Sequence, residues 1–199
     1  MSPPFSAAVL TGGQSRRMGQ DKAFLTHPLE GSPLWLRQVL LLQTLRPERV
    51  YLSQNRGQVF PARPGLARVP DSRPGLGPLG GIASVLEVNA SPLLLVLAGD
   101  LPAMIAAPLL FLLSQSRPGL GAVFTHGEFW EPLAAVYPQE ALPLAQDHLQ
   151  NGRLALRDWV AACVQAELVS LFSLPPVWKP AFSNINRPGD LVTLTASRS

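Results

Sequence analysis

The chain has 199 residues, of which 47% are hydrophobic and 15% charged, and its formal net charge at pH 7 is +3. This length and composition predict a single globular domain over residues 1–199 and exclude a disordered chain. The net charge is small and no basic block stands out, so nucleic-acid binding is not indicated, although the charge suits a small anionic ligand.

The apolar runs and the cysteine content restrict where the protein can be located. The longest apolar run, residues 92–98, is strand-sized, and the N-terminus has no signal-peptide pattern. The single cysteine, Cys163, allows no intramolecular disulfide, which fits a reducing compartment. We therefore expect a cytoplasmic protein without a membrane partner. Cys163 lies among apolar residues of an expected helix, which favours a buried structural thiol over a nucleophile.

Strand-like apolar runs alternate with helical stretches along the chain. In chain order the sequence predicts strand 5–10, helix 33–45 with Ser32 as N-cap, strands 49–53 and 66–69, helix 80–88, strand 93–98, helix 103–114, strands 122–125 and 132–137, helices 138–150 and 153–164, strand 167–171 and helix 188–194. This alternation predicts a three-layer, Rossmann-like α/β fold with a mostly parallel central sheet. Such sheets bind ligands beyond the carboxyl ends of their strands.

A glycine-rich, basic run follows the first predicted strand. Residues Leu10 to Lys22 read L-T-G-G-Q-S-R-R-M-G-Q-D-K. Glycines let backbone N–H groups approach a ligand, and successive N–H groups form an anion site, to which Arg16 and Lys22 add positive charge. The run therefore predicts a polyphosphate cradle, although Gly12 and Gly13 alone are also typical of an ordinary turn. It lacks the Gly-Lys-Ser/Thr of a P-loop.

Asp100 comes directly after the apolar run 93–98. A carboxylate at the end of a buried strand is well placed to hold Mg²⁺, which is usually bound by one or two carboxylates together with substrate phosphates. The alternative is that Asp100 caps the helix expected from residue 103. Spacing alone leaves both interpretations open.

Polar residues and glycines also follow the next two strands. Asn55 follows strand 49–53, Asp71 follows strand 66–69, and the segment 77–80, Gly-Pro-Leu-Gly, precedes a predicted helix. Close backbone approach at a helix N-terminus suits a nucleotide. Ordinary turn and loop chemistry is the alternative for each.

The whole run from Leu10 to Lys22 resembles the signature L-x-G-G-x-S-x-R-M-G-x-D-K of nucleotidyltransferases that activate sugars and cofactors. Within that group it is most similar to the molybdenum cofactor guanylyltransferases. The similarity continues in order through G-P-L-x-G, E-P-L-x-A-x-Y at 131–137 and F-x-N-I-N at 182–186. Gly13 and Asp21 favour the guanylyl over the cytidylyl branch. Ser53 departs from the family's N-x-N segment.

The resemblance implies a nucleotidyltransferase fold and a Mg²⁺-dependent reaction. GMP would pass from GTP to molybdopterin or molybdenum-molybdopterin, with release of pyrophosphate and formation of a guanine dinucleotide cofactor. The implied nucleotide contacts are Leu10, Thr11, Gly12, Gly13, Lys22, Asn55, Asp71, Gly80 and Asp100. Arg16 and Lys22 would neutralise charge, and Asp100 would bind the metal.

Three further residues are implied less directly. Asn184 or Asn186 could complete the metal or phosphate site, or could cap a helix. Arg153 could contact the pterin phosphate of the acceptor, or could be an exposed turn arginine. Molybdopterin-loading proteins and apo-molybdoenzymes are the protein partners that such an activity implies.

Other functions stay open at this stage. They are a cytidylyltransferase acting on the same pterin, a nucleotidyltransferase acting on another small-molecule phosphate, and a non-catalytic cofactor carrier. Lys22 and Asp100 argue against the carrier, because a carrier has no need of metal-assisted phosphoryl chemistry. The histidines His27, His126 and His148 share no metal-ligand spacing.

Overall fold

The computed structural model describes residues 3–11, 22–55, 57–71 and 75–184. The strands are β1 (Phe5–Leu10), β2 (Val50–Gln54), β3 (Leu66–Pro70), β4 (Leu93–Ala98), β5 (Gly121–His126), β6 (Phe129–Trp130), β7 (Ala134–Pro138) and β8 (Val169–Ser173). The α-helices are α1 (Leu34–Thr44), α2 (Gly77–Val88), α3 (Ala106–Gln115), α4 (Leu142–Gln150) and α5 (Leu156–Gln165). Short 3₁₀ helices are η1 (Lys22–Phe24), η2 (Gln139–Ala141) and η3 (Pro176–Phe182).

The eight strands form one sheet in the order β3-β2-β1-β4-β7-β5-β6, with β8 beside β5. β1, β2, β3 and β4 pair in parallel, as do β5 and β8, whereas β7 runs antiparallel to both β4 and β5. The predicted α/β fold with a mostly parallel sheet is therefore confirmed. The reversed strand β7 is the main departure from a purely parallel arrangement.

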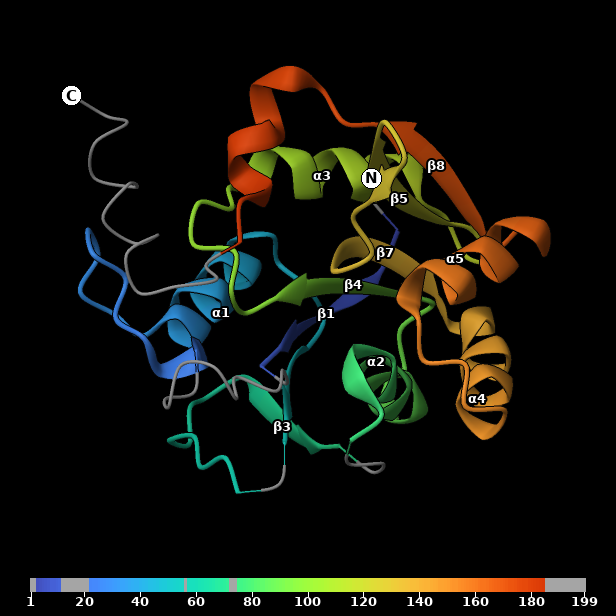
Figure 1. Ribbon diagram of the computed structural model, residues 1–199. Coiled ribbons are helices and arrows are strands. Elements are labelled where there is room, and N and C mark those ends of the chain that lie inside the picture. The colour runs from blue at the N-terminus through green and yellow to red at the C-terminus, as the bar shows by residue number, and fades with distance from the viewer. Residues whose placement is uncertain (1–2, 12–21, 56, 72–74, 185–199) are drawn as a thin grey trace.

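Helices cover both faces of this sheet (Figure 1). The core has two parts, one packed with α1 and α3 and the other with α2, α4 and α5. All six residues of β1 and of β4 are buried. Central parallel strands are covered on both faces, which is why their sequences are almost continuously apolar. Within the described residues, no helix combines the length and hydrophobicity that a bilayer crossing requires.

Several element boundaries differ from the sequence prediction. α1 has Pro33 rather than Ser32 as its N-cap, because the Ser32 carbonyl instead accepts the His27 N–H at 2.8 Å and closes the preceding loop. Residues 131–133 form a turn before β7 rather than part of the strand. The elements η1, β6 and η3 were not predicted, and the predicted helix 188–194 lies outside the described residues.

Close backbone packing at Gly121 gives a direct test of the β5–β7 pairing. A Cβ added at Gly121 would lie 2.1 Å from the Val136 carbonyl oxygen. We expect Gly121→Ala to destabilise the protein by about 3 kcal/mol, because the backbone of the neighbouring strand cannot move aside cheaply. Gly119→Ala is the matched control: Gly119 has φ +79° and open space around it, so only backbone strain of about 1 kcal/mol applies. Urea unfolding of both variants measures the difference, and equal losses would contradict the pairing.

Candidate active site

The carboxyl ends of four neighbouring strands bring the predicted nucleotide residues to one edge of the sheet. At the end of β1, the Leu10 carbonyl accepts the Gly99 N–H at 2.9 Å, and the Thr11 N–H donates to the Ser53 carbonyl at 3.3 Å. One strand further on, the Asp71 N–H donates to the Gln54 carbonyl at 2.9 Å. Backbone hydrogen bonds therefore continue past the strand ends and hold the residues that follow them in fixed relative positions.

Asp100 lies at the centre of this edge, two residues after β4, and is half-buried. The helix-capping alternative does not match the structure, because α3 begins at Ala106 with Ile105 as its N-cap and has no side-chain capping bond. A Cβ on Gly99 would lie 3.2 Å from the Leu10 carbonyl oxygen. The small residue before Asp100 therefore lets the end of β4 stay close to the end of β1.

Two polar residues of α1 support the loop that follows Asp100. The fully buried Gln38 donates from Nε2 to the Leu101 carbonyl at 2.6 Å. Arg37 donates from Nη2 to the Met104 carbonyl at 2.9 Å. Sequence reasoning missed both residues. The sequence feature that could have pointed to them is a pair of polar residues, Arg37 and Gln38, between apolar residues of α1.

Asn55 and Gln58 lie just beyond β2. The Asn55 N–H donates to Gln58 Oε1 at 2.7 Å, and Gln58 Nε2 donates to the Thr11 carbonyl at 3.2 Å. Gln58 belongs to no motif and was also missed by sequence reasoning. It connects the residue after β1 to the residue after β2.

Asp71 and Gly80 are joined through a serine of α2. Ser84 donates from Oγ to the Gly80 carbonyl at 2.9 Å and lies 3.4 Å from Asp71 Oδ1. Gly80 is buried in the first turn of α2, since the helix begins at Gly77, three residues earlier than predicted. A Cβ on the next residue, Gly81, would lie 3.0 Å from Ser53 Oγ, so α2 packs closely against the end of β2.

The reversed strand β7 adds a second group of residues at the same edge. The Ala98 N–H donates to the Leu133 carbonyl at 2.7 Å, which holds the turn 131–133 beside the end of β4. The buried Tyr137 hydroxyl donates to the Pro132 carbonyl at 2.7 Å, and burial raises the Tyr137 pKa well above its ordinary value. The turn that carries Glu131 is therefore fixed from both strands.

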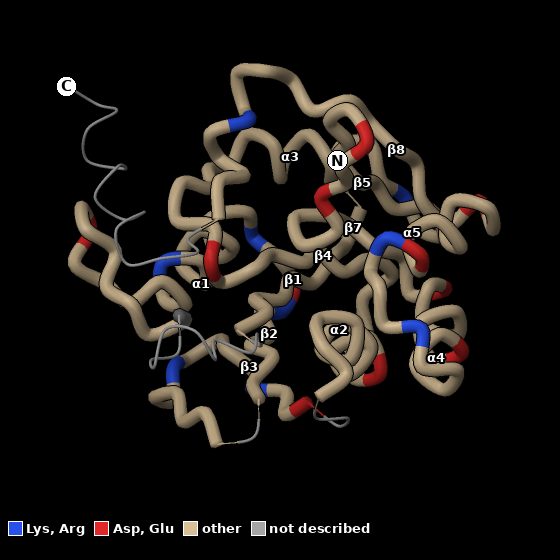
Figure 2. The backbone as a smooth tube through the Cα atoms, in the orientation of Figure 1, with Lys and Arg blue, Asp and Glu red and all other residues tan. Residues whose placement is uncertain are grey.

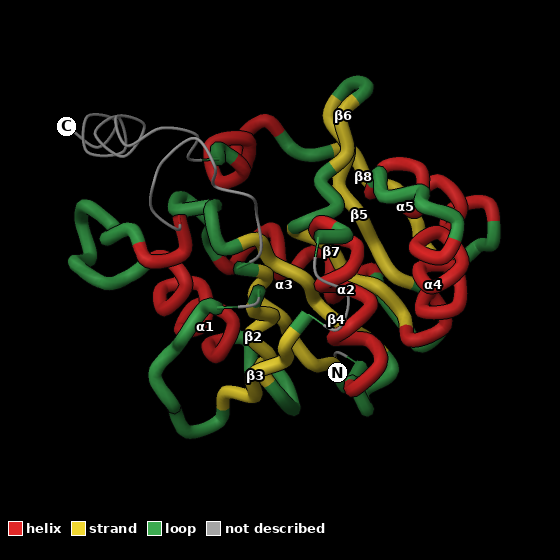
Figure 3. The backbone as a smooth tube through the Cα atoms, turned by 60° about the horizontal axis from the view of Figure 1, so that its bottom comes forward, coloured by secondary structure: helices red, strands yellow, loops and turns green. Residues whose placement is uncertain are grey.

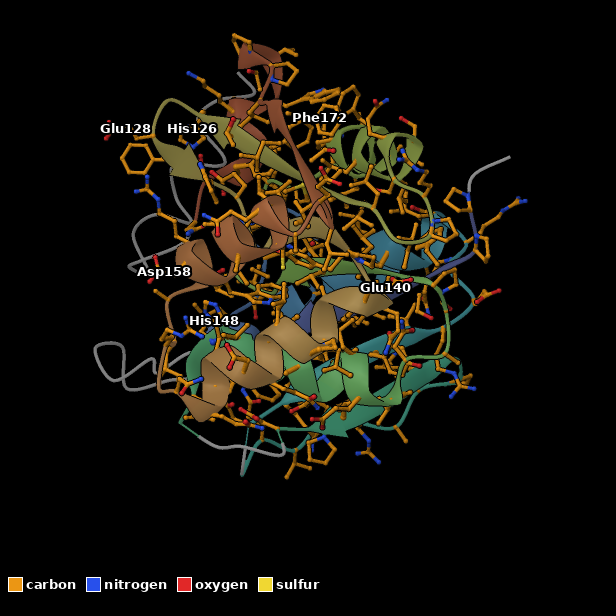
Figure 4. The ribbon with its side chains drawn as sticks, turned by 90° about the vertical axis from the view of Figure 1, so that its right-hand side faces the viewer. His126, Glu128, Glu140, His148, Asp158 and Phe172 are labelled. Atoms are coloured by element: carbon orange, nitrogen blue, oxygen red, sulfur yellow. The ribbon has the colours of Figure 1, made fainter. Side chains whose placement is uncertain are left out.

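Glu131 forms an ion pair with His126, with Oε1 and Nε2 2.8 Å apart. Partial burial raises the pKa of the Glu131 carboxyl, and the hydrogen bond and charge of His126 offset this only in part. The pair lies near the tip of the β5–β6 hairpin, where His126 pairs with Phe129 across the turn, and this hairpin extends beyond the rest of the sheet (Figure 3). Figure 4 shows His126 and Glu128 on this hairpin, on the same side of the view as Asp158 at the start of α5.

Aromatic rings lie beside this ion pair. Phe129, which is 69% exposed, stacks on the His126 ring with centroids 5.6 Å apart. The Arg157 guanidinium lies over the Trp130 ring, 5.7 Å from its centroid. Flat rings and hydrogen-bonding side chains thus occur together next to the start of β7.

Arg153 reaches the same edge because α4 returns the chain from the far end of β7. Its guanidinium forms an ion pair with Asp147, and both side chains are about half exposed. Basic and acidic residues accordingly lie close together near the α4–α5 connection (Figure 2). Asn184 is exposed and follows η3. The contacts predicted for these two residues stay predictions.

Part of the predicted site cannot be placed. Gly12, Gly13, Arg16 and Asn186 lie outside the described residues, and of Lys22 only the backbone, at the start of η1, is described. Among the side chains that the structure does describe, no three His, Cys, Asp or Glu residues gather as a metal-binding group.

Cys163 is a free, fully buried thiol, and desolvation raises its pKa to about 12. Such a thiol stays protonated at neutral pH and is a poor nucleophile, because the thiolate is the reactive form. The prediction of a structural cysteine is confirmed.

The fold of this chain is shared with solved nucleotidyltransferases. Its structure is similar to that of the molybdopterin-guanine dinucleotide biosynthesis protein A from Archaeoglobus fulgidus, with a TM-score of 0.75 and 20% identity over 98% of this chain and 100% of that one. It is also similar to 2-C-methyl-D-erythritol 4-phosphate cytidylyltransferase from Thermus thermophilus, with a TM-score of 0.69 and 17% identity over 96% of each chain. At these low sequence identities, structural similarity establishes the fold alone.

Comparison of the sequence with known proteins identifies the family of this chain. Residues 7–167 match the MobA-like NTP transferase domain, and the chain belongs to that family. A protein of Opitutus terrae named "Probable molybdenum cofactor guanylyltransferase" is 38% identical over 93% of this chain and 92% of its own length. A protein of Deinococcus radiodurans with the same name is 35% identical over 96% of this chain and 94% of its own length.

The raised pKa of Glu131 predicts a pH-dependent gain in stability when its charge is removed. A carboxyl with a raised pKa binds its proton more tightly in the folded than in the unfolded state. The folded protein therefore loses stability as the pH rises from the ordinary carboxyl pKa of 4.5 through the raised pKa of Glu131. Glu131→Gln removes this charge, and the amide oxygen can still accept from His126. We expect the melting temperature of the variant, relative to wild type, to increase across that pH window.

Glu128→Gln, an exposed change on the same hairpin, is the matched control for this experiment. A difference between Glu131→Gln and wild type that does not change with pH would contradict the raised pKa.

Proposed function

We propose that this protein transfers GMP from GTP to the terminal phosphate of molybdopterin or molybdenum-molybdopterin, forming the guanine dinucleotide cofactor and releasing pyrophosphate. The observation that carries the proposal is the meeting of Thr11, Asn55, Asp71 and Asp100 at the ends of four adjacent strands. It is supported by the family of the chain and by the names of its relatives.

The nucleotide would bind along the ends of β1, β2 and β3. There the backbone from Leu10 to Gly13, with Asn55, Asp71 and Gly80, would hold the base, ribose and phosphates. Arg16 and Lys22 would neutralise the charge that develops on the departing pyrophosphate. The acceptor phosphate attacks the α-phosphorus as the bond to pyrophosphate breaks, so positioning and charge neutralisation suffice without a covalent enzyme intermediate.

The donor set suits Mg²⁺ held jointly with substrate. Asp100 offers one half-buried carboxylate, and the described residues form no acidic cluster around it. Mg²⁺ is commonly bound by one or two carboxylates plus phosphate oxygens, so one strand-end aspartate is enough. Asn184 and Asn186 are candidates for further oxygen contacts. When bound, the ion would stabilise negative charge on the transferring phosphate.

The acceptor would occupy the other half of the edge, beyond β4 and β7. The strand order places Glu131 and His126 on the side of Asp100 opposite to the nucleotide residues. Arg153 reaches this side through the α4–α5 connection and would contact the acceptor phosphate after exchanging its Asp147 partner. The role implies delivery from molybdopterin-loading proteins and to apo-molybdoenzymes, both of which stay predictions.

Nucleotide choice is the first test of the proposal. We expect GTP with Mg²⁺ to raise the melting temperature more than CTP, ATP or UTP does. Ligand at about 100 times its dissociation constant adds about 2.7 kcal/mol to the free energy of unfolding. An equal or larger shift with CTP would favour the cytidylyl branch, and nucleotide binding without pyrophosphate release in the presence of molybdopterin would favour a carrier.

Asp100→Asn tests the proposed metal contact, because it keeps the side-chain shape and removes the charge. We expect turnover to fall by at least about a hundredfold, since a metal bridge supplies several kcal/mol of transition-state stabilisation. The melting temperature of the free protein should change little. Pyrophosphate release at saturating Mg²⁺ measures the effect, and near-normal turnover would exclude Asp100 as the ligand.

A further inference from the structure

The side-chain amide of Gln58 makes hydrogen bonds to the ends of two strands at once. Oε1 accepts the Asn55 N–H at 2.7 Å, and Nε2 donates to the Thr11 carbonyl at 3.2 Å. Only the amide oxygen can accept an N–H, so the Asn55 contact fixes which way the amide is turned. The Thr11 hydroxyl lies 3.2 Å from Oε1 and 2.6 Å from the Ser53 carbonyl, so its one proton goes mainly to the closer acceptor.

Gln58 is attached to a rigid part of the molecule. Two residues later, Phe60 is 1% exposed, stacks on Phe24 with centroids 4.8 Å apart, and meets Trp35 edge-on at 5.3 Å. Trp35 belongs to α1 and Phe24 to η1. The connection from β2 to β3 is therefore anchored in the core next to Gln58, and the amide is held from its own side as well as by its partners.

We propose that Gln58 is a positioning residue for the nucleotide, an inference that rests on the proposed function. A hydrogen bond to the Thr11 carbonyl restrains the direction of that carbonyl, which is the last described backbone group before the glycine-rich segment. The same amide fixes the backbone of Asn55. Gln58 thereby sets the relative placement of two nucleotide contacts without touching the reacting atoms.

This role predicts a specific kinetic effect. Groups that hold the base and phosphates interact with GTP in the ground state and in the transition state alike. Loss of such uniform binding raises KM while kcat stays nearly unchanged. We expect Gln58→Met, which keeps side-chain length but removes the hydrogen bonds, to raise the KM for GTP by about tenfold or more. The change in kcat should stay within about threefold.

A second readout reports on positioning without nucleotide. The Asn55 amide proton is bonded to Gln58 in the free protein. In Gln58→Met its hydrogen exchange, followed by NMR, should become about tenfold faster or more, because its acceptor is gone. The matched control is Gln115→Met at the C-terminal end of α3. The one hydrogen bond described for the Gln115 side chain is from Nε2 to Ser114 Oγ at 3.2 Å. This variant should leave KM, kcat and Asn55 exchange unchanged.

The outcomes separate the two proposals. A raised KM with nearly constant kcat and faster Asn55 exchange supports the positioning role. An unchanged KM in Gln58→Met would overturn it while leaving guanylyl transfer intact. A lower kcat together with a lower apo melting temperature, at constant KM, would do the same. Absence of GTP turnover by the wild-type protein would overturn the proposed function together with this inference.

Discussion

The site depends on how closely β1 and β4 approach each other at their carboxyl ends. The two strands pair along their full length, and the Gly99 N–H adds one more hydrogen bond to the Leu10 carbonyl beyond the last pair. A larger residue than glycine would crowd that carbonyl. This close contact places Leu10 and Thr11, the last described residues before the glycine-rich segment, next to the loop that carries Asp100. A phosphate cradle and a metal ligand can act on one phosphate only if they are neighbours in this way.

The reversal of β7 divides the edge into two halves. Because β7 starts at the carboxyl end of β4, the turn that carries Glu131 lies at this edge, and α4 then brings the chain back to it at Arg153. The nucleotide residues come from the strands on one side of Asp100, and these later residues come from the other side. Under the proposed function, donor and acceptor would therefore use separate binding elements with Asp100 between them, as transfer between two bound substrates requires.

The strand ends could be predicted from sequence, but their supports could not. Continuous apolar runs identify β1 and β4, and the residues after them, Thr11 and Asp100, follow from parallel-sheet topology. Gln38 and Gln58 could not be found in this way, because a glutamine that bonds to backbone carbonyls or N–H groups produces no periodic pattern. Their partners are distant in sequence, at Leu101 and Thr11, and only the tertiary structure reveals them. The turn 131–133 is a similar case. The sequence predicts a strand that begins at Pro132, yet the Tyr137 hydroxyl donates to the Pro132 carbonyl and the chain bends before strand pairing begins.

The aromatic contacts around Phe60 connect the supports of the two nucleotide segments. Phe24 belongs to η1, which begins with Lys22, and Phe60 lies two residues beyond Gln58. Stacking of their rings therefore links the segment proposed to neutralise the phosphates with the segment proposed to hold the base. Trp35 joins both to α1, which also carries Gln38 and so reaches the loop after Asp100. Helix α1 is thus the common structural support for the proposed phosphate, base and metal contacts, although its own side chains are not among the proposed ligands.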